Sequence, residues 1–225
     1  MVRFIFKAIF YRLRWIVRFL LCRLSNLRGG RNLDRAKIHR EQRENWTNIV
    51  SRMEDQGTQA SHAEHWKQTT SLAISFIRNS PAICLEIGCE SGWFGAHLKE
   101  HFPEIRYVGA DLLPPTTLHN RMVLADAQQL PFAAQKFDLI VARHVVEHIP
   151  NPGMLREELR RTALPNASIL LALPLGYDRD PCHCWHFMTP KGWTRFLRKN
   201  LELEMVEGCE FGTVEKEFVG SFRML

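Results

Sequence analysis

Apolar and polar positions alternate in blocks along most of the chain. Five apolar runs of strand length recur at 82–87, 105–110, 121–124, 137–142 and 168–173. Helix-like segments separate most of these runs, and such alternation predicts a mainly parallel sheet covered by helices on both faces. Two further strand candidates, 201–207 and 214–222, follow one another without a helix and predict an antiparallel pair. The pattern therefore predicts an α/β fold with a seven-stranded, mainly parallel sheet.

Residue types at the segment ends indicate where helices start and stop. Asn151 can cap a helix whose first turn holds Pro152, and Leu164-Pro165 would close it. Between residues 35 and 78 the spaced apolar residues predict two more helices, the second ending at Ser80-Pro81. We expect three parts: a basic amphipathic segment over 1–30, a helical extension over 31–80 and the main domain over 81–225.

The charge changes the picture of the first of these parts. The chain has a net charge of +6, but residues 1–33 hold eight of its 30 bases and none of its 24 acids. The remainder therefore has a net charge of about −2, which gives little support to a nucleic-acid-binding face. Nucleic acid is not an expected partner.

The N-terminal segment is apolar, aromatic and interrupted by bases. Its uncharged runs are far shorter than the roughly 20 residues that span a bilayer. A helix lying in the membrane interface through residues 1–28 fits this composition. A mitochondrial presequence and a helix that packs on the body or on a second subunit are the alternatives. The expected location is the cytoplasm with peripheral membrane contact, or the mitochondrion.

The six cysteines are scattered and do not form a disulfide framework. Cys182-His183-Cys184-Trp185-His186 is a compact string of metal-ligating residue types. Structural zinc sites usually combine two separated ligand pairs, and no second pair stands out in the sequence. We predict no metal.

A glycine-rich turn follows the first predicted strand, in I-C-L-E-I-G-C-E-S-G-W-F-G at residues 83–95. Asp111 ends the second strand about twenty residues beyond the glycines, where an acid can bind both ribose hydroxyls. NAD, FAD and S-adenosylmethionine all satisfy this geometry, and a plain turn residue is the alternative for Asp111. Glu86 and Glu90 oppose a pyrophosphate and favour the ammonium and sulfonium of S-adenosylmethionine.

Four segments in this order carry a resemblance to a known family: L-E-I-G-C-E-S-G, Y-V-G-A-D, A-D-A-Q-Q-L-P-F at 125–132, and F-D-L-I-V-A-R-H-V-V-E-H-I at 137–149. Together they resemble the class I S-adenosylmethionine-dependent methyltransferases, particularly the type 11 group. The resemblance spans residues 81–190 and implies a Rossmann-like fold, S-adenosylmethionine as cofactor and methyl transfer as activity.

The resemblance also implies a cofactor-binding role for Glu86, Gly88, Gly92, Asp111, Asp126, Ala127 and Ala142. The first three would shape the pocket for the methionine end, and Asp111 would hold the ribose. Asp126 would accept from the adenine amine while a backbone N–H at Ala127 donates to the ring. Residues 142–144 would form the floor beside the sulfonium. Glu90 departs from the family by replacing the middle glycine of G-x-G-x-G.

Transfer to a hydroxyl often needs a base, and histidine suits that task near neutral pH. The catalytic candidates are His144, His183 and His186, while His148 belongs to a common family string and is expected to pack or hydrogen-bond. We expect a small-molecule or lipid-linked substrate. The alternatives are a non-catalytic, membrane-associated methyltransferase-like protein and an NAD-dependent oxidoreductase; RNA methylation suits the basic tail but not the slightly acidic body.

Overall fold

A single mixed sheet forms the centre of the molecule. The computed structural model describes residues 59–114, 119–176, 183–212 and 216–225, with six more residues between 17 and 26. The strands are β1 (Ile83–Ile87), β2 (Arg106–Asp111), β3 (Met122–Leu124), β4 (Phe137–Arg143), β5 (Ala163–Pro174), β6 (Leu203–Phe211) and β7 (Glu217–Met224). They lie in the order β3-β2-β1-β4-β5-β7-β6. Strands β1 to β5 pair in parallel, whereas β7 is antiparallel to both of its neighbours. The predicted Rossmann-like, seven-stranded fold is confirmed.

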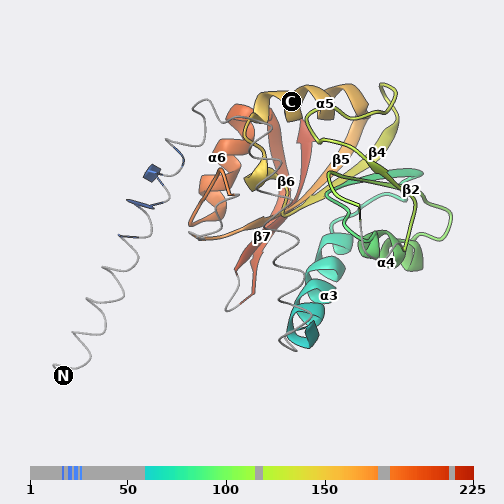
Figure 1. Ribbon diagram of the computed structural model, residues 1–225, viewed down its shortest axis with the longest axis horizontal. Helices are drawn as coiled ribbons and strands as arrows, with labels where there is room; N and C mark the ends of the chain where they lie inside the picture. Colours follow the sequence, from blue (N-terminus) through green and yellow to red (C-terminus); the bar gives the residue numbers. More distant parts are fainter. Residues whose placement is uncertain are drawn as a thin grey trace.

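Helices cover both faces of this sheet. They are α3 (Gln59–Ser75), α4 (Trp93–His101), α5 (Pro152–Thr162) and α6 (Pro190–Asn200), with a short 3₁₀ helix η1 (Val146–His148). In Figure 1, α5 and α6 lie above the sheet and α3 and α4 lie below it. Two apolar clusters match these layers, one containing Leu155 and Trp193 and the other containing Ile74 and Phe94.

The central strands bury side chains on both faces, which explains why their sequences are continuously apolar. In β4, Ile140 and Ala142 join the cluster beneath α5 and α6, while Leu139 and Val141 join the cluster beside α3 and α4. From β1 the chain adds β2 and β3 on one side of the sheet, and then β4 and β5 on the other side, so the strand order reverses between β1 and β4. In open α/β sheets this is where ligands bind, outside the carboxyl ends of the strands.

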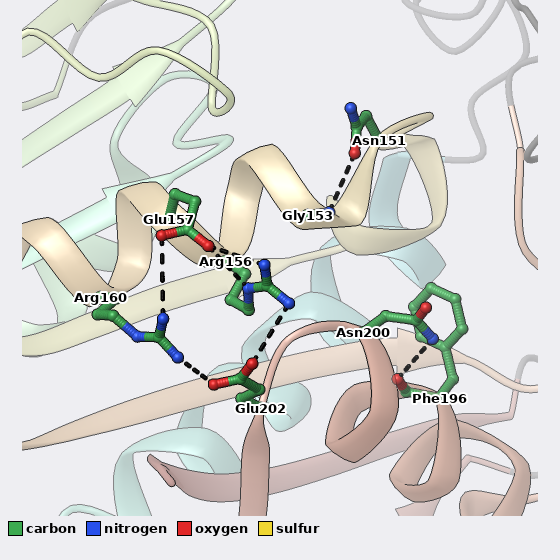
Figure 2. Close-up of polar contacts among 8 residues, drawn as sticks. All are labelled: Asn151, Gly153, Arg156, Glu157, Arg160, Phe196, Asn200 and Glu202. Atoms are coloured by element: carbon green, nitrogen blue, oxygen red, sulfur yellow. Dashed lines mark hydrogen bonds and ion pairs between the residues drawn. The ribbon is translucent and has the colours of Figure 1, made fainter.

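The predicted helix start at Asn151 is confirmed, and α6 begins in the same way at Thr189. The Asn151 side chain accepts a hydrogen bond from the Gly153 amide, and the Thr189 side chain accepts one from the Gly192 amide. On the surface of α5, Arg156 and Arg160 both form ion pairs with Glu202, as Figure 2 shows. Such exposed pairs contribute about 0–1 kcal/mol each, so apolar packing holds α5 in place.

The start of one strand differs from expectation, and α3 ends at Ser75 instead of Ser80-Pro81. Strand β5 starts at Ala163 instead of 168, because the chain leaves α5 directly into extended backbone that pairs with Phe137 before a register shift. Strand β7 pairs directly with β5, so β6 forms the outer edge. The first helix predicted between 35 and 78 lies outside the described residues, as does most of segment 1–30. No helix among the residues described could cross a membrane.

Candidate active site

The turn after β1 is shaped by a close approach of two backbone segments. Gly88 has a φ of 70°, and its amide donates to the Ala110 carbonyl at 2.8 Å. A Cβ atom on Gly88 would lie 2.3 Å from Cγ2 of Val145, which follows β4. Gly92 has a φ of 76° and precedes α4. Glycine is therefore required at 88 by both conformation and space, as expected where backbone must pass close to a bound ligand.

Glu86 is fully buried at the end of β1. Its Oε2 accepts a hydrogen bond from the Tyr107 hydroxyl at 2.5 Å, and its Oε1 accepts one from Arg143 Nη2 at 3.1 Å. Burial raises the pKa of Glu86, while Arg143 and Tyr107 oppose that rise. Arg143 also donates to Thr70 on α3 and lies 4.7 Å from the centre of the Phe94 ring. The role of Glu86 toward the methionine end stays a prediction.

Asp111 at the end of β2 organises the glycine-rich turn. Its Oδ2 accepts from the Glu90 amide at 2.7 Å, and its Oδ1 accepts from the Leu113 amide at 3.0 Å. Glu90 has a φ of 48°, a left-handed conformation that glycine adopts without strain. A carboxylate offers about four acceptor positions, so Asp111 retains capacity for ribose hydroxyls, the role predicted for it.

The segment after β3 lies at the same edge of the sheet. The Ala125 amide donates to the Asp111 carbonyl at 2.7 Å, which places Asp126 close to the tip of β2. The Oδ1 atom of Asp126 accepts from the Gln128 amide at 2.8 Å. Ala127 is half-buried beside the core, and Ala142 is buried where β4 pairs with Ile87. The structure thus brings the predicted ribose, adenine and floor positions to one edge.

His144 lies between two buried carboxylates. Its Nδ1 is 3.3 Å from Glu147 Oε1, and its Nε2 is 3.0 Å from Glu217 Oε1. Burial lowers the pKa of His144, but the two carboxylates outweigh this effect and raise it to about 10. Such an imidazole is protonated at neutral pH and cannot accept a proton. The catalytic role of His144 stays a prediction, and this charge state opposes its use as a base.

Three further histidines lie close together at η1, namely His148, His183 and His186. The His148 and His183 rings are 4.5 Å apart, and the His183 and His186 rings are 5.6 Å apart. His186 is buried, and its backbone exchanges two hydrogen bonds of 2.8 Å with the Asn26 side chain. His183 is only partly buried, so it is the more accessible of the two predicted catalytic residues in this segment.

Glu147 is a buried member of this site that sequence reasoning missed. Burial alone would raise its pKa, but His144, His148 and His183 together lower it to about 2. In the sequence Glu147 is one residue of a string common in the family. The signal in the sequence that could have identified Glu147 is its position three residues after the candidate His144.

A shallow hollow of about 300 Å³ lies at the opposite edge, among the first residues of β1, β2 and β4. Ligands of parallel sheets bind at the carboxyl edge, so we place the site with the acids and histidines.

The sheet order, the glycine turn and the acids after β2 and β3 define a class I methyltransferase site. Residues 60–207 match the family described as "Methyltransferase domain", and the chain belongs to that family. The chain therefore carries a methyltransferase domain of the kind that uses S-adenosylmethionine. The predicted family and cofactor are confirmed.

Curated relatives and solved structures agree with this class. The chain is 30% identical over 115 residues to malonyl-[acyl-carrier protein] O-methyltransferase of Legionella pneumophila, covering 47% of this chain and 40% of the relative. It is 29% identical over 122 residues to trans-aconitate 2-methyltransferase of Azoarcus sp., covering 52% and 48%. The chain thus spans less than half the length of these relatives. The fold matches 1,6-didemethyltoxoflavin-N1-methyltransferase of Burkholderia thailandensis, solved with S-adenosylhomocysteine, with a TM-score of 0.59 at 13% identity over 80% of this chain and 90% of that one.

Proposed function

We propose that this enzyme methylates a hydroxyl oxygen of a small-molecule or lipid-linked substrate. The observation that carries the proposal is the group of imidazoles at the carboxyl edge of the sheet. His183 and His148 lie beside η1, and Val145, which precedes η1, contacts the glycine turn at Gly88. A substrate bound there would have a histidine near its nucleophile and the methyl donor on its other side.

The bound cofactor supplies an electrophilic methyl group. Asp111 and Asp126 would hold its ribose and adenine, and the narrow turn at Gly88 would let its methionine end approach the backbone. Arg143 and Tyr107 keep the buried Glu86 in a fixed orientation through three hydrogen bonds. These contacts favour alignment of nucleophile, methyl carbon and sulfur, which is the main requirement of an in-line displacement.

Two relatives support a small or carrier-linked molecule as the substrate, and the name of the first specifies oxygen as the acceptor. One is a malonyl-[acyl-carrier protein] O-methyltransferase and the other is a trans-aconitate 2-methyltransferase. His183, or His186 after a local rearrangement, would accept the hydroxyl proton as the carbon–oxygen bond forms.

The lipid-linked option depends on the N-terminal segment. Four apolar residues described there are exposed, namely Val17, Leu20, Leu21 and Leu24. A membrane surface would cover such side chains while neighbouring bases meet lipid headgroups. On this proposal, residues 1–30 are a membrane-contacting segment, 31–80 an extension and 81–225 the methyltransferase domain.

The test measures S-adenosylhomocysteine release with panels of soluble and lipid-linked hydroxyl compounds, followed by mass spectrometry of the product. We expect an O-methyl product and a lower kcat for His183→Ala, with His101→Ala on the exposed face of α4 as the control. A product methylated on nitrogen or carbon would refute the proposed chemistry. Unchanged activity on lipid-linked substrate after removal of residues 1–28 would refute the membrane role.

A further inference from the structure

Three metal-ligating side chains meet beside η1. Glu147 and His148 come from η1, whereas His183 comes from the segment that follows β5. One ligand atom from each of these residues lies within 4.8 Å of the others. We infer that Glu147, His148 and His183 form a binding site for a divalent transition-metal cation, with Zn²⁺ as the best match.

The buried carboxylate of Glu147 supports a cation-binding role for this site. Its side chain is fully buried, and neither of its oxygens receives a hydrogen bond from the residues that the structure describes. The ion pair with His144 at 3.3 Å involves only one of the two oxygens. A buried carboxylate normally has its oxygens satisfied by donors or by a metal. A cation between Glu147 and the two histidines would supply that partner.

The backbone holds the two halves of the site together without the metal. The Cys184 and Trp185 amides donate to the Glu147 carbonyl at 2.7 and 3.2 Å. The Trp185 indole donates to the Ile149 carbonyl at 2.7 Å. These bonds fix the segment carrying His183 against η1, so the ligands are close to their required positions before the metal binds.

The sulfur of Cys184 is not part of this ligand set. Its thiol contacts the His148 carbonyl at 3.8 Å and is buried. The described part of the string Cys182–His186 therefore contributes the imidazole of His183, while Cys182 lies outside the described residues. Glu147-His148 is the second ligand pair that the sequence did not reveal.

Ligand chemistry selects the metal. Two imidazoles and one carboxylate match catalytic zinc sites, which keep one position open, and are poorly suited to Mg²⁺ or Ca²⁺, which prefer oxygen. At bonds of about 2.1 Å, two ligands are about 3.4 Å apart at tetrahedral angles and at most about 4.2 Å apart. Because the ligand atoms lie within 4.8 Å of one another, the site needs a contraction of up to about 1.4 Å to reach the tetrahedral spacing, and rotation of the partly buried His183 can contribute to it.

His144 and Glu217 extend the site outward. Metal-bound carboxylates usually contact a further polar group that fixes their orientation. His144 has that position, since it lies between Glu147 and Glu217 at 3.3 and 3.0 Å. His144 is the predicted catalytic residue least suited to act as a base, and this arrangement gives it a positioning role instead.

The open position of the cation gives it a role in methyl transfer, and this part rests on the proposed function. A substrate hydroxyl that coordinates the cation loses its proton to solvent more readily, so in the metal-bound enzyme His183 acts as a ligand and the cation replaces it as the group that activates the hydroxyl. The oxygen then forms a bond to the methyl carbon while the carbon–sulfur bond breaks, leaving S-adenosylhomocysteine. The substrate class is thus a hydroxyl compound able to bind a metal through oxygen.

The experiment titrates Co²⁺, a coloured substitute for Zn²⁺, into the chelator-treated full chain without cofactor or substrate. We expect one Co²⁺ per chain with visible absorption bands, displaced by Zn²⁺. Glu147→Gln and His183→Gln should each weaken Co²⁺ binding by at least about 10–100-fold, which is the loss typical when a residue that only hydrogen-bonds a metal ligand is removed. His101→Gln is the matched control and should bind normally. Far-UV circular dichroism of the metal-free proteins verifies folding, and because His183 is only partly buried, His183→Gln keeps the test informative if Glu147→Gln does not fold.

Two outcomes would overturn the site. Absence of Co²⁺ bands in the wild type would show that the histidines only neutralise Glu147. Bands that persist in both ligand variants but vanish in Cys182→Ser would assign the metal to the cysteines. Because the titration contains no S-adenosylmethionine, its result is separate from the O-methylation test above.

Discussion

Replacing Gly88 by alanine tests how closely the turn after β1 approaches the segment after β4. The added Cβ would meet Cγ2 of Val145 at 2.3 Å, and the residue would have to keep a φ of 70°. These two penalties are separable. Truncating Val145 to alanine removes the colliding methyl group but leaves the backbone conformation unchanged.

The magnitudes follow from the two causes. A left-handed conformation costs a residue with a side chain about 1–2 kcal/mol, and overpacking costs about 1–3 kcal/mol. Gly88→Ala should therefore reduce the free energy of unfolding by about 2–5 kcal/mol. Val145→Ala removes two methyl groups from a half-buried side chain and should cost about 1–1.5 kcal/mol. The double variant should recover the overpacking part, so the two substitutions should couple favourably by about 1–3 kcal/mol.

Chemical denaturation of the four proteins measures this coupling. Gly176→Ala is the control, because Gly176 has a φ of 130° and none of the described atoms outside its chain neighbours lies within 4 Å of its added Cβ. It should show a backbone penalty without coupling to Val145. Calorimetry with S-adenosylhomocysteine should show weaker binding in Gly88→Ala. Additive effects at 88 and 145 would refute the close approach.

Four other substitutions test the acids of the site and of α5. Glu90→Gly should gain about 1 kcal/mol in the free energy of unfolding, because glycine accepts a φ of 48° without strain; a loss of stability would mean that the turn is misassigned. Asp111→Asn and Asp126→Asn should each weaken S-adenosylhomocysteine binding in calorimetry by about 10-fold or more, since hydrogen bonds to charged groups contribute about 1.5–3 kcal/mol. Arg161 lowers the pKa of Glu158, so stability from this pair is present above about pH 4.3 and is lost as pH falls through the lower folded pKa. Denaturation of Glu158→Gln across pH should therefore differ from wild type at pH 6 and converge with it in acid.

Local patterns in the sequence were sufficient to predict the sheet and its helix starts. The apolar runs of β1, β4 and β5 correspond to strands buried on both faces, and Asn151 accepts the predicted capping bond. The order of β6 and β7 could not be predicted from local patterns. β7 pairs with β5 in a position that buries Phe218 and Phe222 in the core, and this packing joins residues far apart in the sequence.

The candidate site was predicted only as far as its motifs are contiguous. Asp111 ends β2 and Asp126 follows β3, so their common edge follows from the parallel topology. The contact between Glu147 and His183 joins the segments after β4 and β5, and no spacing rule brings them together. Likewise, the pairing of Arg143 with Glu86 depends on the register of β4 against β1. Long-range contacts of this kind determine the charge of each group and therefore its chemistry.

The charges of the turn explain why this fold takes a sulfonium cofactor instead of a dinucleotide. Glu86 is already balanced by Arg143, so it contributes less to the choice than its place in the sequence suggests. Desolvation raises the pKa of Glu90, and the carboxylate of Asp111 raises it further, so the turn holds two neighbouring acids that disfavour another anion. A pyrophosphate 4 Å from such a carboxylate would be repelled by about 4 kcal/mol per charge pair at an effective dielectric constant of 20, whereas a sulfonium or ammonium would be attracted by a similar amount. Calorimetry should therefore show S-adenosylmethionine binding that weakens with salt and no measurable binding of NAD. Glu90→Gln should bring the affinities for these two ligands closer together.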